Sequence, residues 1–163
     1  MTRPDLPYRI RMPAVAADLP PSIAARIVAE HNRERRALGL KPYRHDTRLD
    51  HVASLRVLDM VIEGYFGHDD RRDDPIRIDG KYHEIMVATG IRVFRFAGEN
   101  LWQGAPAWRE QDIPRAVVQG FLKSPRHRPQ VVDRGFDAMG CHMARRPEDG
   151  WAVVCCVYAE GAT

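Results

Sequence analysis

The first third of the chain carries apolar residues at helical spacing. From Ser22 to Leu38 they recur every three or four positions near one face, and His31 lies on the same face. Ser22 follows two prolines and is suited to cap the helix, while Gly39 is suited to end it. This pattern predicts an amphipathic helix over 22–38, in which His31 is a hydrogen-bonded core residue rather than a ligand.

A second apolar stripe predicts a helix from about Thr47 to Glu63. Thr47 with Asp50 three residues later resembles a capping box, and Gly64 ends the pattern. The stripe consists of Leu49, Val52, Ala53, Val57 and Met60. His68 comes just after this helix, where a side chain is held by a rigid element and can still reach into a groove.

Residues 80–90 lie between glycines and predict a short helix. From 93 to 97 apolar and polar residues then alternate, which is typical of a half-buried strand. Gly98 breaks the alternation, so we expect a turn that presents Glu99 at the end of the strand. A buried glutamate is tolerated there only if it is paired or hydrogen-bonded. On the residues alone, the simpler interpretation is that Glu99 and Asn100 satisfy backbone groups of this turn.

The C-terminal half of the chain predicts one helix and a hairpin. The helix has Asp112 as its cap and Pro114 in its first turn, and it ends before Pro125. Two apolar segments, 138–144 and 151–158, flank the turn sequence RRPEDG. They predict a pair of antiparallel strands.

Three cysteines gather near the C-terminus, Cys141, Cys155 and Cys156, so at least one is unpaired within a monomer. Because successive strand residues face opposite ways, at most one of Cys155 and Cys156 can meet Cys141 across the hairpin. One disulfide is geometrically possible. The pattern nevertheless favours buried free thiols, because unpaired cysteine is among the residue types most often buried.

Composition fits a single globular domain. The length of 163 residues is close to the roughly 150 typical of one domain. Hydrophobic residues make up 44% and charged residues 29%, which favours a folded core over disorder. Residues 1–21 contain five prolines and predict an extended arm or linker before one domain over 22–163.

The charge pattern does not indicate a nucleic-acid partner. The net charge is +3, and the sequence has neither a run of five or six basic residues nor an interleaved aromatic stripe. No stretch approaches the roughly 18 apolar residues of a membrane span. The N-terminus also lacks the apolar core of a signal peptide.

Three short segments carry the candidate chemistry. They are FGHDD at 66–70, AGENLWQG at 97–104 and SPRHR at 124–128. They supply His68, Glu99 and His127, two imidazoles and a carboxylate, which suit a metal site if the fold brings them together. Because His127 follows a helix end, the backbone carbonyls favour its imidazolium, whereas a cation requires the neutral ring. We therefore expect metal affinity to depend on pH.

The order of these motifs, with the HN pair at 31–32, resembles the CAP superfamily of cysteine-rich secretory proteins, antigen 5 and PR-1 proteins, also called SCP-like domains. The chain is most similar to the short bacterial form, from about Pro21 to Ala159. The resemblance implies an α+β fold, a three-layer α-β-α sandwich with a small antiparallel sheet between helices. Asn32 matches an asparagine near the start of the family domain, and we expect a structural role for it.

The resemblance also implies a site in an open cleft, formed by His68, Glu99 and His127. Many eukaryotic members carry a second glutamate one turn before the last histidine, and Ser124 stands at that place here. The expected site is thus a triad with a hydroxyl neighbour. His68 and His127 are the expected ligands of a divalent cation, zinc or magnesium, and no organic cofactor is expected.

Members of this superfamily differ in function, so the fold alone does not decide it. The leading hypothesis is a non-enzymatic, extracytoplasmic binding domain whose cleft takes the cation and a larger ligand: a small molecule, a lipid, a peptide or a cell-wall component. The first alternative is a metal-dependent hydrolase, because two histidines and a carboxylate match a catalytic zinc site with an open position. A metal-free hydrolase using Ser124 with His127 and a structural extracellular domain without an active site are further alternatives. The family implies a secreted or periplasmic location, and a cytoplasmic one stays open because the sequence shows no signal peptide.

Overall fold

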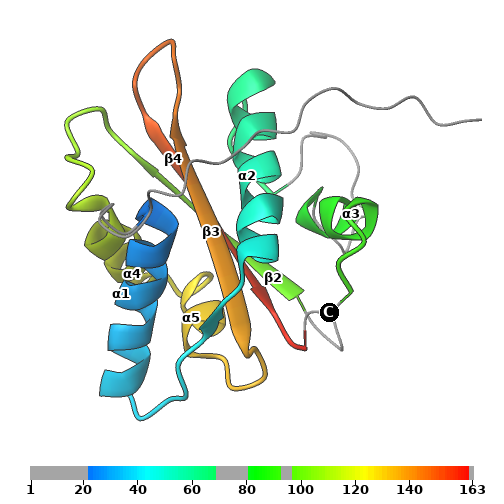
Figure 1. Ribbon diagram of the computed structural model, residues 1–163. Coiled ribbons are helices and arrows are strands. Elements are labelled where there is room, and N and C mark those ends of the chain that lie inside the picture. The colour runs from blue at the N-terminus through cyan, green and yellow to red at the C-terminus, as the bar shows by residue number, and fades with distance from the viewer. Residues whose placement is uncertain (1–21, 69–80, 93–96, 162–163) are drawn as a thin grey trace, which may run out of the picture.

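The structure, a computed structural model, describes residues 22–68, 81–92 and 97–161 (Figure 1). Within them the chain forms the helices α1 (Ile23–Ala37), α2 (Thr47–Ile62), α3 (Lys81–Ala88), α4 (Ile113–Lys123) and α5 (Arg128–Val132), and the strands β1 (Arg44–His45), β2 (Ala97–Gly104), β3 (Ala138–Arg145) and β4 (Ala152–Ala159). The arm expected over 1–21 and most of the strand expected over 93–97 lie outside the described residues.

The four strands form one sheet in the order β1-β3-β4-β2. β4 pairs antiparallel with both β3 and β2, and the hairpin of β3 and β4 follows the expected segments to within one residue. β1 instead pairs parallel with β3 through Arg44 and His45. The sheet is therefore mixed rather than wholly antiparallel. The sequence does not predict β1, because a two-residue strand is too short to show an alternating pattern.

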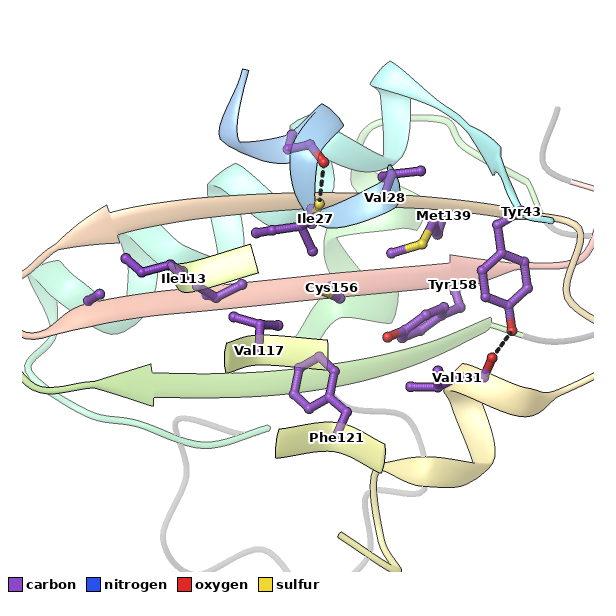
Figure 2. Close-up of a cluster of buried hydrophobic side chains, with 14 residues drawn as sticks. Ile27, Val28, Tyr43, Ile113, Val117, Phe121, Val131, Met139, Cys156 and Tyr158 are labelled. Atoms are coloured by element: carbon purple, nitrogen blue, oxygen red, sulfur yellow. Dashed lines mark hydrogen bonds between the residues drawn. The ribbon is translucent and has the colours of Figure 1, made fainter. Parts of the chain in front are cut away.

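Helices cover both faces of this sheet, which gives the α+β sandwich that the resemblance implies (Figure 1). α1, α4 and α5 lie over one face, and α2, with α3 beside it, lies over the other. On the first face, Ile27 and Phe121 belong to one buried cluster with Tyr158 of β4 (Figure 2). On the other face, the apolar stripe of α2 packs against Cys155 and Val157. Every residue of β4 is buried, because the strand lies between two helical layers.

The helix ends follow the sequence pattern with one correction. Ser22 caps α1, its Oγ accepting a backbone N–H at 3.1 Å, and Gly39 ends the helix with a φ of 68°. The cap of α2 is Asp46, and the capping box expected at Thr47 is wrong by one residue. The Asp46 carboxylate accepts the Arg48 N–H at 3.0 Å and also binds its guanidinium at 2.7 Å. This added ion pair makes the carboxylate the better cap.

The start of α4 differs in detail from the expectation. Pro114 occupies the first turn, but the Asp112 side chain does not cap the helix. Its carboxylate accepts the Arg109 Nε–H at 2.8 Å instead. The sequence pattern does not predict α5, because five residues are too few to display a helical period. Within the described ranges, none of the helices is long and apolar enough to span a bilayer.

α2 crosses β3 at very close range. A Cβ built on Gly140 would lie 2.3 Å from the backbone nitrogen of Asp50, so only glycine permits this approach. The Asp50 carboxylate accepts the Cys141 N–H at 2.8 Å and binds the His45 ring at 2.8 Å. These contacts fix α2, and with it Arg56, over the sheet.

All three cysteines are buried and free, which confirms the prediction. Cys141 lies opposite Cys156 on the face covered by α1, whereas Cys155 faces α2. Burial raises the pKa of the Cys155 and Cys156 thiols well above the ordinary value. Buried thiols of this kind are unreactive, so we assign them to packing.

Candidate functional site

The candidate site is built on β2, an edge strand of the sheet. Glu99 is the third residue of this strand and pairs with Val157, so it does not lie in a turn at the strand end as expected. The strand accommodates Gly98 in regular pairing, which is why the alternation continues past it. Because successive side chains face opposite ways, Glu99 points towards α2 and Asn100 towards Tyr158 on the other face.

Glu99 forms a buried ion pair with Arg56 of α2. The two side chains are 1% and 0% exposed, and the Arg56 Nε–H donates to Glu99 Oε2 at 2.8 Å. A second guanidinium nitrogen lies 3.4 Å from Oε1, and the Cys155 thiol donates to Oε2 at 3.4 Å. Burial opposes the charge on Arg56, but the adjacent carboxylate outweighs it and holds the Arg56 pKa above its ordinary value.

Arg56 also fixes the loop that follows α2. Its guanidinium donates to the Gly67 carbonyl at 2.6 Å and to the Tyr65 hydroxyl at 2.8 Å. The Tyr65 hydroxyl in turn donates to the Asp59 carboxylate, which also binds Lys81 at 2.9 Å. Burial and the Asp59 contact raise the Tyr65 pKa to about 12, so the hydroxyl stays protonated.

Arg56 is not among the site residues expected from the sequence, although its position carries a signal. Arg56 lies four residues after Val52 and four before Met60, on the apolar stripe of α2. A charged residue on a buried helix face requires hydrogen-bond or ion-pair partners. The position of Arg56 therefore indicates polar partners across the interface, and one of them is the Glu99 carboxylate.

His68 is oriented by this network. Its Nδ1 lies 2.9 Å from Glu99 Oε1, and the side chain is 55% exposed. The same Arg56 side chain holds the preceding Gly67 carbonyl. Nε2 of His68 forms no hydrogen bond with any part of the chain that the structure describes. The ring is thus fixed through one nitrogen and offers the other to solvent.

His127 is oriented by neutral groups at the end of α4. Its Nδ1 lies 2.8 Å from Ser124 Oγ, and its carbonyl accepts the Asn100 amide at 2.9 Å. The ring also packs against Phe121, with centroids 5.5 Å apart. As with His68, no described residue hydrogen-bonds its Nε2.

The two imidazoles lie close enough to influence each other electrostatically. Burial lowers the pKa of His127, and the charges of His68 and Arg126 lower it further. This is opposite to the effect expected from the carbonyls at the C-terminal end of α4. His127 also stands at the N-terminal cap position of α5, where the helix dipole disfavours a cation.

A neutral network extends from Asn100 into the core. Its amide donates to the Tyr158 hydroxyl at 3.3 Å, and that hydroxyl lies 2.9 Å from His31 Nε2. His31 Nδ1 lies 2.9 Å from the Ile27 carbonyl, and burial lowers its pKa to about 4. His31 is therefore the hydrogen-bonded core residue that its place on the apolar stripe predicts. Asn32 bonds both backbone groups of Tyr43, at 2.7 and 2.9 Å, in the expected structural role.

The four expected site residues thus form two hydrogen-bonded pairs beside β2. Glu99 binds His68, and Ser124 binds His127. Among the residues that the structure describes, no group of three or more His, Cys, Asp or Glu side chains is arranged to hold a metal ion. The carboxylate that the triad supplies is already engaged by Arg56.

Comparison with known proteins gives consistent matches. The model of the "Cysteine-rich secretory protein family" (CAP) matches residues 28–158. The uncharacterized protein YkwD of Bacillus subtilis is 31% identical over 124 residues, which cover 74% of this chain and 43% of YkwD. An extracellular protein of Bacillus anthracis that contains an SCP domain superposes with a TM-score of 0.65 at 21% identity, over 85% of this chain and 40% of that protein. The chain spans less than half the length of both relatives.

Two further solved structures of this fold contain metal. Manganese-bound Ac-ASP-7, an Ancylostoma-secreted protein, has a TM-score of 0.54 at 16% identity, over 85% of this chain and 68% of that one. NaASP2 with Zn²⁺ has a TM-score of 0.54 at 13% identity, over 82% and 76%. At these identities the similarity shows a shared fold only. The family match, the Bacillus relative and the shared sandwich together show that this chain belongs to the cysteine-rich secretory protein (CAP) family.

Proposed function

We propose that this chain is an extracytoplasmic binding domain that takes one divalent cation between Nε2 of His68 and Nε2 of His127. One observation carries the proposal: each ring is held through Nδ1, at 2.9 Å from Glu99 and at 2.8 Å from Ser124, so that Nε2 remains available. Histidine ligands of metals are commonly oriented in this way, through a hydrogen bond of the second ring nitrogen to a carboxylate or another acceptor.

Glu99 supports this site without being a ligand. Both of its oxygens accept hydrogen bonds from Arg56, and one also contacts His68. The donors that remain are two imidazole nitrogens, which suit zinc better than magnesium, because magnesium requires oxygen ligands. With no third protein ligand in place among the described residues, we expect weak affinity and coordination positions open to water or to a larger ligand.

The relatives support a location outside the cytoplasm. The matched family is that of the cysteine-rich secretory proteins, and the Bacillus anthracis relative is an extracellular protein. The larger ligand of the site would be a small molecule, a lipid, a peptide or a cell-wall component that approaches the exposed face of His68.

The hydrogen bonds that already engage the Glu99 carboxylate favour binding without turnover over hydrolysis. A hydrolase needs a general base that can accept a proton in the reaction. Glu99 accepts bonds from Arg56 and Cys155 and contacts His68, so it has little freedom to act as that base. Ser124 is bound to His127 at 2.8 Å, but the described residues show no third group that orients this histidine through Nε2.

Isothermal titration with zinc tests the proposal. At neutral pH we expect one zinc per chain, and His68→Ala and His127→Ala should each weaken binding by about tenfold or more. His51→Ala, which removes an exposed histidine of α2, is the matched control and should bind as the wild type does. Acidification should release the zinc, because the imidazoles must be neutral to bind it.

Each other outcome contradicts a part of the proposal. Equal heats for the wild type and for both site variants would assign zinc to a different site, and no heat at all would favour a structural domain. Ester or peptide hydrolysis that disappears with a chelator and in folded His127→Ala would make the chain an enzyme. Circular dichroism of each variant shows that the loss is not due to unfolding.

A further inference from the structure

A groove on the α4 face of β2 is lined by none of the four residues of the histidine site. It has a volume of about 560 Å³ and lies between β2 and α4, with Trp102 and Trp108 among its lining residues. Trp102 packs against the buried cluster beneath α1 and α4, whereas Glu99 contacts Arg56 on the α2 face. The groove and the Glu99–His68 pair therefore lie on opposite faces of the sheet.

Two glycines make room for the Trp102 ring. A Cβ on Gly104 would lie 2.0 Å from the indole, and a Cβ on Gly120 would lie 3.3 Å from it. The Trp102 ring thus lies along its own strand over Gly104 and contacts α4 at Gly120. Trp108 meets it edge to face, with ring centroids 6.1 Å apart, and is 42% exposed. The result is an aromatic wall that a ligand can contact without moving it.

The loop that carries Trp108 is held in place by the β3–β4 hairpin. Arg145 donates to the Trp108 carbonyl at 2.6 Å and to the Gly150 carbonyl at 2.9 Å. A second cavity of about 270 Å³ also borders Trp108 and Asp112, so the two cavities share these residues. A ligand of more than one ring that contacts Trp108 is within reach of both.

The charges around the groove select for an anion. Arg115 and Lys123 line it from α4 and are exposed, and neither has an ion-pair partner within the described ranges. Asp112 also lines it, but its carboxylate is paired with Arg109 at 2.8 Å. Two free cations thus face the groove, and a guanidinium is well suited to bind a carboxylate.

The lining also distinguishes sugars from lipids. Gln111 and Gln119 contribute amide groups, which an acyl chain would cover without hydrogen-bonding them. The Gln119 amide nitrogen also donates to Glu34 at 3.2 Å, which leaves its oxygen to accept from a ligand. A pyranose offers C–H groups to the electron-rich face of an indole and hydroxyl groups to these amides. We propose that this groove, which we name the tryptophan groove, binds a carboxylate-bearing sugar within an oligosaccharide. The proposal is independent of the cation at His68 and His127.

Titration with defined oligosaccharides tests this, followed by tryptophan fluorescence and by the NMR shifts of the indole N–H groups. The probes are a tetrasaccharide of alternating glucuronate and N-acetylglucosamine, the neutral tetramer of N-acetylglucosamine, and decanoate. We expect the acidic sugar to bind most tightly and to lose affinity as salt increases. Trp108→Ala should weaken it by about tenfold, and Arg115→Gln and Lys123→Gln by about three- to fivefold each.

Controls separate this groove from the histidine site. Arg134→Gln removes an exposed arginine between α5 and β3 and should leave sugar binding unchanged, as should His68→Ala. Equal binding of the neutral tetramer, binding of decanoate alone, absence of sugar binding, or insensitivity to Arg115→Gln and Trp108→Ala in folded variants would each overturn the proposal.

Discussion

The two histidines at β2 are supported in different ways by the two faces of the sheet. On the α2 face, His68 contacts the Glu99 carboxylate, which is paired with the buried Arg56. On the α1 and α4 face, His127 is bound by the Ser124 hydroxyl, and its backbone by the Asn100 amide. One support therefore depends on two opposite charges remaining together, and the other on groups that stay neutral.

This difference determines what each support tolerates. A buried charge that loses its partner keeps the full cost of desolvation, whereas a lost neutral hydrogen bond costs much less. The α2 face should therefore be the more sensitive to mutation. The neutral face should be the more sensitive to acid, because its buried His31 has to remain uncharged.

The largest expected effect comes from breaking the charged support. Arg56→Ala leaves the Glu99 carboxylate buried without its cation and removes the bonds to Gly67 and Tyr65. We expect a loss of about 3–5 kcal/mol in the free energy of unfolding. Urea unfolding followed by circular dichroism measures this.

The matched control replaces both charges at once. Arg56→Met with Glu99→Leu leaves no unpaired charge, so the double variant should be clearly more stable than Arg56→Ala. If the double variant is as unstable as the single one, packing rather than charge pairing maintains this face.

The neutral support should show its weakness in the pH dependence of stability. His31 titrates near its ordinary value of 6.5 when unfolded and at about 4 when folded, so the unfolded chain binds the extra proton. Its contribution is complete above pH 6.5 and is lost as the pH falls towards 4. The difference amounts to about 3 kcal/mol. Urea titrations at several pH values in this window measure it.

His31→Gln provides the comparison for this loss. The amide keeps hydrogen-bonding ability but does not titrate, so the variant should show a flatter profile between pH 6.5 and 4, whatever its stability at neutral pH. An unchanged slope would assign the acid sensitivity to other groups.

The smallest expected effect is a shift in the pKa of His127 when His68 is removed. The charge of His68 lowers the pKa of His127, after the larger effect of burial and together with Arg126. His68→Ala should therefore raise the pKa of His127 part of the way to its ordinary value. An NMR titration of the His127 ring protons measures this, and a pKa that stays constant would place the rings too far apart to share a cation.

The helices α1 to α4 and the hairpin could be predicted because their signals are local. Ser22 and Gly39 mark the two ends of α1 through capping and a left-handed backbone, neither of which needs a distant partner. Errors arose where a distant residue decides the outcome. Within the described residues, β2 passes through Gly98 because β4 supplies its hydrogen bonds, and β1 exists because β3 lies beside it.

The candidate site shows the same division. The sequence by itself determined which chemical groups are present, through the motifs that contain His68, Glu99 and His127, and it carried the unused signal of Arg56 on an apolar stripe. Only the tertiary structure decided which atoms of these groups remain free. Arg56 and Glu99 are 43 residues apart and meet only when α2 lies on the sheet, and the Glu99 carboxylate that is held there also contacts His68. Hydrogen bonds between distant residues depend on packing, which no local pattern contains.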